Sequence, residues 1–340
     1  MHLTICFSQF FKKNMAQMSS RTVVITGANS GIGRAAAHYF AREGHYVIMA
    51  CRSIERSDPI RREVIQTSGN EGVELRQVNV SSMSSIREFS EEITKQHSVI
   101  DVLIHNAAYI DHGAPYRLSE DDIELTFATN VVGPYLLTTL LIDSLKRSED
   151  ARVLNAGSNI VKHFFDPKLE IDFENLQGEI PHDPSFSVYK RYRDLKMALL
   201  VLTFEMAERL RPEEIHVNAL QINGARMSKE TIRKFAPRYR LIAHVQNLFF
   251  PPPESVAETY YQICTAEELK GISGKYFNHR GQIMQVGKED PGVIDQVKQL
   301  VGASLYPCYA ERSNVAERIW SWCEEVTGER MTDTTSENTN

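Results

Sequence analysis

The sequence predicts a three-layer α/β fold in a single domain, in which helices cover both faces of a doubly wound parallel sheet. From Arg21 onward, short apolar runs alternate with longer helical stretches, which is the pattern of successive βαβ units. No stretch rich in Pro, Gly or Ser divides the chain, so we expect its 340 residues to share one domain.

Six runs of the chain have the length and composition of buried strands. These candidate strands are Thr22 to Thr26, Tyr46 to Ala50, Val73 to Val78, Val99 to Ile104, Arg152 to Ala156 and His216 to Leu220. Because helical stretches separate them, the strands are expected to run parallel within one sheet.

Local signals mark several helix ends. The first helix, Ile32 to Glu43, stops at Gly44, a residue type that tolerates the left-handed conformation after a helix. The segments 255–258 (SVAE) and 314–317 (NVAE) predict capping boxes that open two later helices. Gly328 is expected to end the last helix.

The ends of the chain differ from its centre. We expect residues 1–20 to be a flexible leader, 21–330 the folded domain and 331–340 a disordered polar tail. The apolar run Leu3 to Phe11 is too short to span a bilayer, and its basic pair follows it, which is the wrong order for a signal peptide. The true start could even be Met15 or Met18.

The overall composition is that of a soluble globular protein, with 42% hydrophobic and 24% charged residues and a net charge of −6. It implies no nucleic-acid partner and no integral membrane segment. The five cysteines are scattered, without a CxxC pair or a Cys/His spacing suited to zinc, so no metal site is expected. We expect a cytoplasmic protein, and we leave peripheral membrane association and a homodimer open.

The first strand runs directly into a glycine-rich turn. The segment Gly27-Ala-Asn-Ser-Gly31-Ile-Gly33 precedes an amphipathic helix. Glycines allow unusual backbone angles and let backbone N–H groups approach a pyrophosphate at a helix N-terminus. A lone glycine pattern would also fit a structural turn, but its place at the first strand–helix junction favours a dinucleotide cofactor.

The end of the second strand indicates which dinucleotide. Where an NAD site would keep an acid for the ribose 2′-hydroxyl, the sequence has Ala50-Cys51-Arg52-Ser53. Arg52 can pair with a 2′-phosphate, and Arg34 lies where it could assist. Each arginine alone would more often be a surface charge, but together with the missing acid they favour NADP(H) over NAD(H), which stays an alternative.

A tyrosine and a lysine lie four residues apart in a helical stretch. Tyr192-Arg-Asp-Leu-Lys196 places the phenol and the ammonium one turn apart on one face. We expect Lys196 to lower the pKa of Tyr192 and make it a general acid/base. Tyr189 is the rival, but its fourth neighbour is Arg193, which cannot share a proton at neutral pH. A Tyr/Lys pair at this spacing is commonly incidental, so the assignment of a catalytic role depends on the residues around it.

Two polar residues accompany this pair. Ser158 follows the fifth strand, and therefore lies at the carboxyl edge of the sheet, where open α/β folds bind ligands. Its alternative role is to cap a turn. Asn130 occurs inside a helical stretch, where asparagine is otherwise unfavourable.

Taken together, these motifs resemble the short-chain dehydrogenase/reductase family, nearest its retinol dehydrogenase-like and WW-domain oxidoreductase-like branch. The resemblance covers approximately Arg21 to Gly328 and implies a Rossmann fold. The matching pieces are the turn TGANSGIG, the ACR ending of the second strand, Asn106 and Ala107 after the fourth strand, Asn130, Ser158, YRDLK, and the stretches 271–277 and 316–320.

The resemblance implies a role for each catalytic residue. Tyr192 would donate the proton to a carbonyl oxygen as hydride reaches the carbon, and Ser158 would hydrogen-bond the same oxygen. Lys196 would hold the nicotinamide ribose and tune Tyr192, and Asn130 would support a water in a proton relay. The implied cofactor-binding residues are Gly27, Asn29, Ser30, Gly31, Ile32, Gly33, Arg34, Arg52, Asn79, Val80, Asn106, Ala107, Tyr192 and Lys196.

Three positions depart from the family pattern. Ala108 puts a methyl where the family has a glycine beside the cofactor. The Pro-Gly expected after the sixth strand is replaced by Ile222-Asn223 within Gln221-Ile222-Asn223-Gly224, which puts cofactor affinity and turnover in question. Asn79 stands where the family usually has an acid that touches adenine.

We expect two stretches, Asn159 to Phe186 and Ile222 to Phe250, to wall a substrate pocket. Their large apolar residues suit a lipophilic carbonyl such as a retinoid, steroid or fatty aldehyde, or they simply pack the loops onto the domain. These residues include Phe164, Phe165, Phe173, Phe235, Tyr239, Leu248 and Phe249. His163 and His182, without spaced partners, favour surface or packing roles.

Three functions follow, in order of preference. The first is an NADP(H)-dependent oxidoreductase that transfers hydride between the nicotinamide and a carbonyl, or a primary or secondary alcohol. The second is a cofactor-binding regulatory or scaffold protein with weakened catalysis, which the departures at Ala108 and residues 222–223 favour. The third, a reductase for a carrier-bound or sugar substrate, is disfavoured by the apolar loops.

Overall fold

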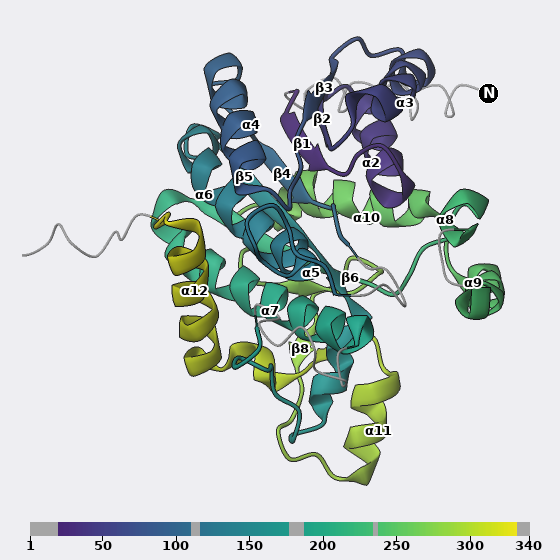
Figure 1. The fold of residues 1–340 in the computed structure, drawn as a ribbon, viewed down its shortest axis with the longest axis vertical. Coiled ribbons are helices and arrows are strands. Elements are labelled where there is room, and N and C mark those ends of the chain that lie inside the picture. The colour runs from purple at the N-terminus through teal and green to yellow at the C-terminus, as the bar shows by residue number, and fades with distance from the viewer. Residues whose placement is uncertain (1–19, 110–115, 177–186, 234–236, 332–340) are drawn as a thin grey trace, which may run out of the picture.

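The computed structural model describes residues 20–109, 116–176, 187–233 and 237–331. Its main sheet has seven parallel strands in the order β3-β2-β1-β4-β5-β6-β7, and the order reverses next to β1, as in a doubly wound fold (Figure 1). The strands are β1 (Thr22–Thr26), β2 (Tyr46–Cys51), β3 (Val73–Gln77), β4 (Val102–His105), β5 (Ala151–Ser158), β6 (Ile215–Ile222) and β7 (Tyr276–Phe277).

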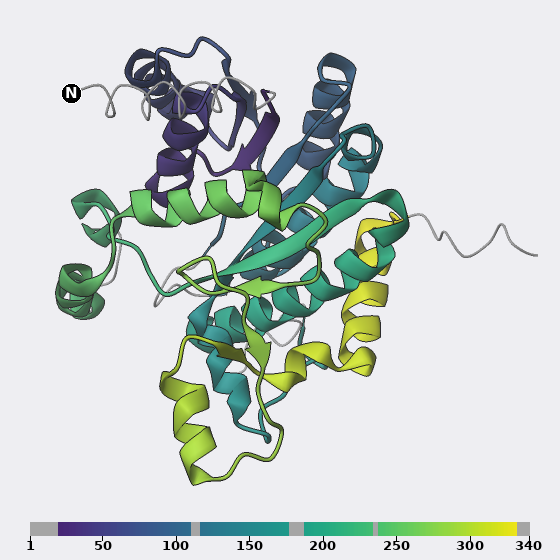
Figure 2. The same ribbon diagram turned by 180° about the vertical axis from the view of Figure 1, so that it is seen from behind.

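Helices cover both faces of this sheet, which makes three layers (Figures 1 and 2). One apolar core lies under α2 (Gly31–Arg42), α3 (Ile54–Ser68) and α10 (Pro253–Thr265). The other lies under α4 (Met83–Gln96), α6 (Gly133–Leu145), α7 (Val188–Arg209) and α12 (Ser313–Thr327). Because the central strands β1 and β4 are buried on both faces, their sequences are largely apolar rather than alternating, whereas the edge strand β3 (VELRQ) alternates and is only partly buried.

Shorter elements complete the described chain. They are α5 (Leu125–Phe127), the π-helix η1 (Ala128–Val132), η2 (Asn159–Phe165), η3 (Arg211–Glu213), α8 (Lys229–Arg233), α9 (Pro237–Phe249), η4 (Glu267–Leu269), β8 (Gln285–Val286), α11 (Val293–Val301), β9 (Leu305–Tyr306) and η5 (Cys308–Glu311). Strands β8 and β9 pair as a separate two-stranded ribbon.

The predicted strands are confirmed with small shifts, and β7 is an additional one. The fourth strand begins at Val102, because Asp101 belongs to the preceding loop, where its carboxylate accepts a hydrogen bond from the Thr22 N–H at 2.7 Å. Gly44 and Gly328 adopt positive φ angles of 86° and 67°, as predicted for residues that follow helices.

Both predicted capping boxes are wrong. Helix α10 begins at Pro253, whose fixed φ suits the first helical turn, and the Ser255 hydroxyl donates instead to the Pro252 carbonyl at 2.9 Å. Helix α12 begins at Ser313, one residue before the predicted cap Asn314.

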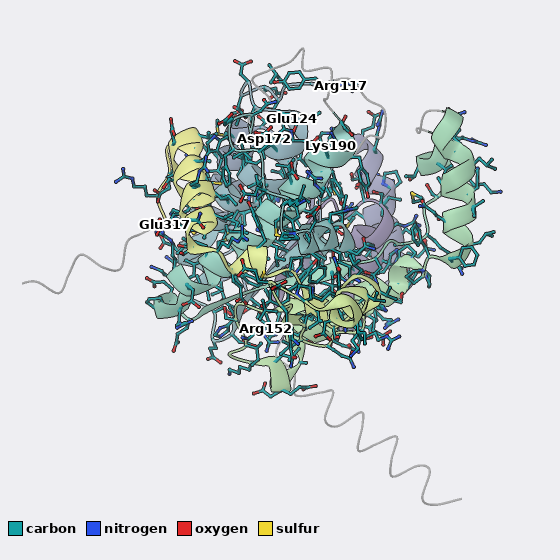
Figure 3. The ribbon with its side chains drawn as sticks, turned by 90° about the horizontal axis from the view of Figure 1, so that it is seen from below. Arg117, Glu124, Arg152, Asp172, Lys190 and Glu317 are labelled. Carbon is teal, nitrogen blue, oxygen red and sulfur yellow. The ribbon has the colours of Figure 1, made fainter. Side chains whose placement is uncertain are left out.

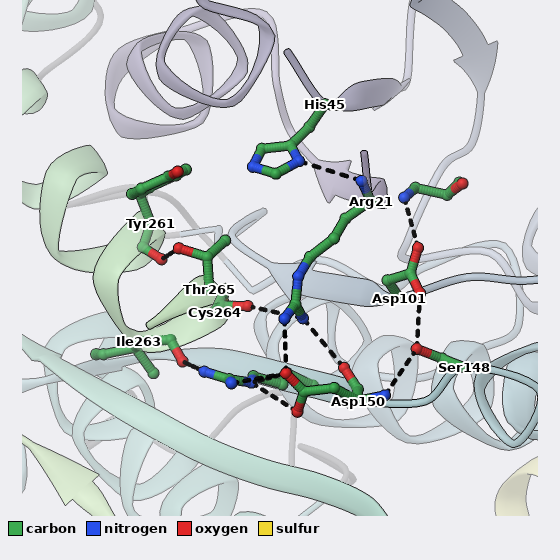
Figure 4. A network of polar contacts seen from close by, with 11 residues as sticks. Arg21, His45, Asp101, Ser148, Asp150, Tyr261, Ile263, Cys264 and Thr265 are labelled. Carbon is green, nitrogen blue, oxygen red and sulfur yellow. Dashed lines mark hydrogen bonds and ion pairs between the residues drawn. The ribbon is translucent and has the colours of Figure 1, made fainter. Parts of the chain in front are cut away.

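A charged network fastens the amino edge of the sheet (Figure 4). Arg21 and Arg152 share the carboxylate of Asp150, with shortest N–O distances of 2.6 and 2.7 Å. Arg152 also donates to the Ile263 carbonyl at 3.0 Å. The network joins the residue before β1, the start of β5 and the last turn of α10, so it supports the sheet at the end opposite the strand tips.

Two further predictions concern the ends of the chain and the absence of a membrane-spanning segment. The predicted leader (1–20) and tail (331–340) lie outside the described residues, apart from Ser20 and Met331. Among the described residues, one helical stretch, Leu125–Leu145, has the length and hydropathy to cross a membrane, but 83% of it is buried inside the protein. Its burial identifies it as a core element.

Candidate active site

Helix α7 presents Tyr192 and Lys196 to the carboxyl end of β5. Lys196 is buried, and its ammonium donates a hydrogen bond to the Ala156 carbonyl at 2.9 Å. The same nitrogen lies 5.6 Å from the centre of the Tyr192 ring. The predicted pair therefore exists as one unit, held against the sheet by the backbone of the fifth strand.

Ser158 is the last residue of β5 and lies beside the phenol. Its hydroxyl hydrogen-bonds with Tyr192, and it also accepts from the Ile160 N–H at 3.3 Å at the start of η2. The capping role considered for this serine is therefore confirmed, and its hydroxyl also lies beside Tyr192, where the catalytic role was predicted. Its backbone is held by Tyr276 on β7, whose hydroxyl donates to the Ser158 carbonyl at 2.9 Å.

The environment raises the pKa of Tyr192 rather than lowering it. Burial of the phenol raises its pKa to about 12, and the Ser158 hydrogen bond lowers it only in part. Burial also lowers the pKa of Lys196 to about 7, so this group carries only part of its charge at neutral pH. The predicted net lowering of the Tyr192 pKa is therefore wrong, because desolvation dominates the shift and Lys196 does not offset it.

Tyr189, the rival tyrosine, lies elsewhere. Its side chain is 47% exposed, and its hydroxyl is 3.0 Å from His163 Nε2. Arg193 pairs with Asp194 on the same helix. His163 thus has the surface role that was expected of it, whereas His182 lies outside the described residues.

Asn130 lies in the π-helical turn η1, between α5 and α6. Its amide group donates to the carbonyls of Thr126 at 2.8 Å and Tyr109 at 3.1 Å. Its Oδ1 is buried without a hydrogen-bond partner among the described residues. An unsatisfied buried acceptor calls for a further donor, and single π-helical turns frequently occur at functional sites. A water or ammonium donor would fit here.

The helical segments that carry Asn130 and the Tyr192/Lys196 pair begin on the same side of the molecule. Figure 3 shows Glu124, at the start of α5, on the same side as Lys190 in the first turn of α7, and Arg152 on the opposite side. The Glu124 carboxylate accepts from the Thr126 and Phe127 N–H groups and so fixes the turn that leads to Asn130.

The glycine-rich turn is close-packed against the end of β4. Gly27 and Gly31 have φ angles of 66° and 52°, which disfavour other residues. A Cβ on Gly33 would lie only 2.4 Å from both Asn106 Nδ2 and the Gly27 carbonyl oxygen, whereas a Cβ on Gly31 would meet nothing within 4 Å. The turn thus packs inward through Gly33 and leaves open space over Gly31, as a diphosphate at the start of α2 requires.

Thr26 organises this turn, although sequence reasoning did not select it. Its hydroxyl donates to the Ile104 carbonyl and accepts from the N–H groups of Asn106 and Ala107, each at 3.0 Å. The Asn106 amide in turn donates to the Thr26 carbonyl at 3.0 Å. In the sequence, Thr26 opens the matching turn TGANSGIG, but no role was predicted for it.

The two arginines predicted for a 2′-phosphate have different surroundings. Arg52 follows the last residue of β2, and its side chain is exposed. Arg34 instead forms an ion pair with Glu63 of α3, in which its Nη2 contacts both carboxylate oxygens. The remaining predicted adenosine contact, Asn79, accepts from the Ser81 hydroxyl at 2.9 Å through its Oδ1.

Of the remaining predicted cofactor contacts, Asn29, Ile32 and Val80 have neighbours within the protein. The Asn29 amide donates to the Ser57 hydroxyl at 2.9 Å, and Ser30 precedes the first residue of α2. Ile32 packs on the apolar core under α2. The Val80 carbonyl faces Gly133, where a Cβ would lie 2.3 Å away.

The departures from the family pattern have structural consequences. Ala108 is exposed beside the strand tips. Gln221 is fully buried and donates to Asn223 Oδ1 at 3.0 Å, and Asn223 Nδ2 lies 2.9 Å from His279 Nδ1. Gly224 takes the strained backbone angle here, with φ 119°. Side-chain hydrogen bonds therefore hold the loop after β6, without a proline.

The predicted pocket walls divide into two groups. Phe164 and Phe165 are buried, and Phe164 packs on Tyr309 with ring centres 4.8 Å apart, so these residues fasten η2 to the body. Leu248 and Phe249 are instead 75% and 82% exposed on α9. Phe173 packs on the core, and Arg318 lies 3.9 Å above its ring. Phe235 and the side chain of Tyr239 lie outside the described residues.

Comparisons with known proteins agree with this geometry. The family model described as short chain dehydrogenase matches residues 21–165. The chain is 32% identical over 268 residues to retinol dehydrogenase 13 of Mus musculus, covering 77% of each chain. It is 30% identical over 318 residues to retinol dehydrogenase 13 of Homo sapiens, covering 92% of this chain and 86% of that one. The chain belongs to the short-chain dehydrogenase/reductase family.

Further relatives bear on the branch and the fold. This short-chain dehydrogenase is 30% identical over 266 residues to WW domain-containing oxidoreductase of Gallus gallus, covering 77% of this chain and 62% of that one. A solved protein from Mycobacterium paratuberculosis shares the fold, with a TM-score of 0.64 at 24% identity over 94% of this chain and 98% of that one. So does a short chain dehydrogenase from Escherichia coli CFT073 complexed with NADPH, with a TM-score of 0.60 at 17% identity over 78% and 99% of the chains.

Membership of the family gives the site its chemistry. The protein is an oxidoreductase that acts on CH–OH groups and belongs with the retinol dehydrogenase-like members. The residues at the strand tips fit a nicotinamide dinucleotide, because the glycine turn leaves space at the start of α2 and Asn130 keeps an unsatisfied acceptor beside the catalytic helix.

Proposed function

We propose that this protein is an NADP(H)-dependent reductase of lipophilic carbonyl compounds, of the retinoid, steroid or fatty-aldehyde type. The observation that carries the proposal is the grouping of Tyr192, Ser158 and Lys196 at the carboxyl end of β5. The bound dinucleotide would supply or accept the hydride. Preference for NADP(H) is supported by exposed Arg52 after β2, where an acid is missing.

The residues of the chain would handle the oxygen and its proton. With its pKa raised to about 12, Tyr192 keeps its proton at neutral pH and can donate it to a carbonyl oxygen as the carbon receives hydride. Ser158 would hydrogen-bond the same oxygen, where negative charge develops. Lys196 would hold the ribose hydroxyls, and a water bound to Asn130 would return a proton to Tyr192 through Lys196.

The lipophilic substrate class is supported by the relatives and by the aromatic content of the loops after β5 and β6. The names of the relatives make retinol their substrate, and the loops after β5 and β6 are rich in aromatic residues.

The second candidate function is a cofactor-binding regulatory protein with slow catalysis. It is favoured by the hydrogen-bonded loop Gln221–Asn223–His279, which replaces a Pro-Gly turn, and by Ala108. The two candidates differ in turnover but share cofactor binding.

Titration of the purified protein with NADPH and NADH, followed by a screen of retinal, steroid ketones and aliphatic aldehydes, tests the proposal. We expect tighter NADPH binding and steady oxidation of NADPH, with Tyr192→Phe losing at least about 10²-fold in turnover and keeping NADPH affinity. Equal rates in the variant and the wild type would refute the catalytic assignment, and cofactor binding without turnover on any substrate would favour the regulatory protein.

A further inference from the structure

Helix α9 carries an apolar stripe that faces away from the protein. Leu241, Val245, Leu248 and Phe249 are 73%, 51%, 75% and 82% exposed. Their spacing of four, three and one places them on one face of the helix, within an arc of about 100°. Ala243 and Asn247 on the opposite face hold the helix to the body, since Ala243 is buried and Asn247 exchanges two hydrogen bonds with the Met227 backbone.

The helix projects from the body together with α8. In Figures 1 and 2 the two helices stand beyond the end of α10, and in Figure 3 they are again separate from the other elements. The stripe therefore has no partner among the described residues. Contact between such an apolar face and water is unfavourable. A contiguous exposed apolar face of this kind therefore marks an interaction surface.

The charge around the stripe is strongly positive. Residues 226–250 contain six arginines and lysines and a single acidic residue, Glu230, in a chain whose net charge is −6. The basic residues whose side chains are described are all exposed, namely Arg226, Lys229, Arg233 and Arg240. A basic helix with one apolar face suits the surface of an anionic lipid membrane, where the apolar side chains enter the interface and the bases meet the headgroups.

A second copy of the chain is a poorer partner for this face. Two α9 segments in a symmetric contact would bring two positive regions together, and like charges repel.

The stripe is also joined to the active site. Phe250, the residue after α9, packs on Gly224 in the loop that follows Ile222, and Ile222 pairs with Ser158 across β5 and β6.

We propose that α9 is a membrane-docking element that rests on an anionic lipid surface through Leu241, Val245, Leu248 and Phe249. Docking there would hold the loop after β6 close to the lipid, so a substrate dissolved in the bilayer could reach the site. This inference rests on the surface of α9 and stands whether or not the proposed substrate class is right.

Co-sedimentation of the full chain with vesicles tests the proposal. We expect binding to phosphatidylcholine vesicles that contain about 30% phosphatidylserine, weaker binding to phosphatidylcholine alone, and a decline as salt is raised. The double variant Leu248→Asp/Phe249→Asp should bind at least roughly tenfold more weakly. Lys229→Glu/Arg233→Glu should lose the preference for the anionic lipid.

Helix α11 offers a matched control, because Ile294 and Val301 are 73% and 81% exposed. Ile294→Asp/Val301→Asp should bind vesicles like the wild type. NADPH affinity and circular dichroism should be unchanged in every variant, which separates this test from that of the catalytic proposal. The proposal fails if the wild type does not bind, if the α9 and α11 variants lose binding equally, or if the α9 variant converts a dimer into a monomer in sedimentation velocity.

Discussion

The ammonium of Lys196 donates a hydrogen bond to the carbonyl oxygen of Ala156 at 2.9 Å, and this contact fixes the catalytic helix α7 to the fifth strand. It also keeps an ionisable amino group in a buried place. Burial lowers the pKa of Lys196 to about 7, so the residue that the site requires is one that the fold disfavours in its charged form.

Replacement of this lysine should make the protein more stable and less active. The unfolded chain protonates Lys196 up to its ordinary pKa of 10.5, but the native state does so only below about 7. The buried lysine therefore lowers the free energy of unfolding by its full amount below pH 7. This destabilisation disappears as the pH rises toward 10.5. We expect Lys196→Met to raise the free energy of unfolding by about 2 kcal/mol at pH 6.5, after the loss of the bond to Ala156, and to lower kcat at least about 10²-fold.

Urea unfolding of both proteins between pH 6 and 9.5 measures this gain. The gain should shrink steadily as pH rises. A gain that does not change with pH would show that packing, and not the lysine charge, is responsible.

Removal of the Asn130 amide should damage both stability and catalysis. Asn130→Ala leaves the Thr126 and Tyr109 carbonyls without this donor, so we expect the free energy of unfolding to fall by about 1–3 kcal/mol. It also removes the unsatisfied Oδ1, so kcat should fall at least about tenfold with little change in KM for the cofactor. Thr139→Ala is the control, because the hydrogen bond of Thr139 to the Tyr135 carbonyl lies within α6. Unchanged kcat in Asn130→Ala would remove this residue from the proton path.

Arg52, and not Arg34, should decide the choice of cofactor. Arg52 is exposed at the end of β2, whereas Glu63 already engages Arg34. A charge-assisted contact with a 2′-phosphate stabilises binding by about 1.5–3 kcal/mol, so Arg52→Ala should weaken NADPH about 10- to 100-fold and leave NADH unchanged. Arg34→Ala should have a smaller effect.

Glu63→Ala should release Arg34 and increase the preference for NADPH. Fluorescence titration of the variants with both dinucleotides measures each effect. Equal losses for NADPH and NADH in Arg52→Ala would rule out recognition of the 2′-phosphate by this residue.

Two glycines of the phosphate-binding turn should respond differently to substitution. A Cβ at Gly33 would lie 2.4 Å from Asn106 Nδ2 and from the Gly27 carbonyl oxygen, so Gly33→Ala should displace the turn and abolish measurable cofactor binding. At Gly31 nothing lies within 4 Å, and the cost is the left-handed backbone, about 1 kcal/mol. Thermal unfolding with and without NADPH compares the two variants. A Gly33→Ala protein that NADPH still stabilises like the wild type would contradict the close packing of this turn.

Much of the site could be predicted because its signals are local. The glycine turn, the missing acid before Arg52 and the spacing of Tyr192 and Lys196 are each contained within a few residues, and local spacing fixes which face of a helix or which end of a strand a residue occupies. Ser158 was found because it directly follows an apolar strand, and such strand ends meet at one edge of a parallel sheet.

The errors arose where distant segments meet. Glu63 captures Arg34 from the next helix, and the Tyr276 hydroxyl holds the Ser158 backbone from 118 residues away. The exposed stripe of α9 was taken for a pocket wall, because an apolar residue in the sequence does not show whether the protein or its surroundings covers it.

The sequence by itself determined the parallel α/β architecture, the glycine-rich turn after β1 and the choice of Tyr192, Ser158 and Lys196 as candidate catalytic side chains, since periodicity and turn chemistry act over short stretches of chain. Only the tertiary structure decided the charge states and neighbours of those side chains. Burial moves the pKa of Tyr192 upward and that of Lys196 downward. Desolvation depends on every segment that packs around a group, and that packing exists only once the chain has folded.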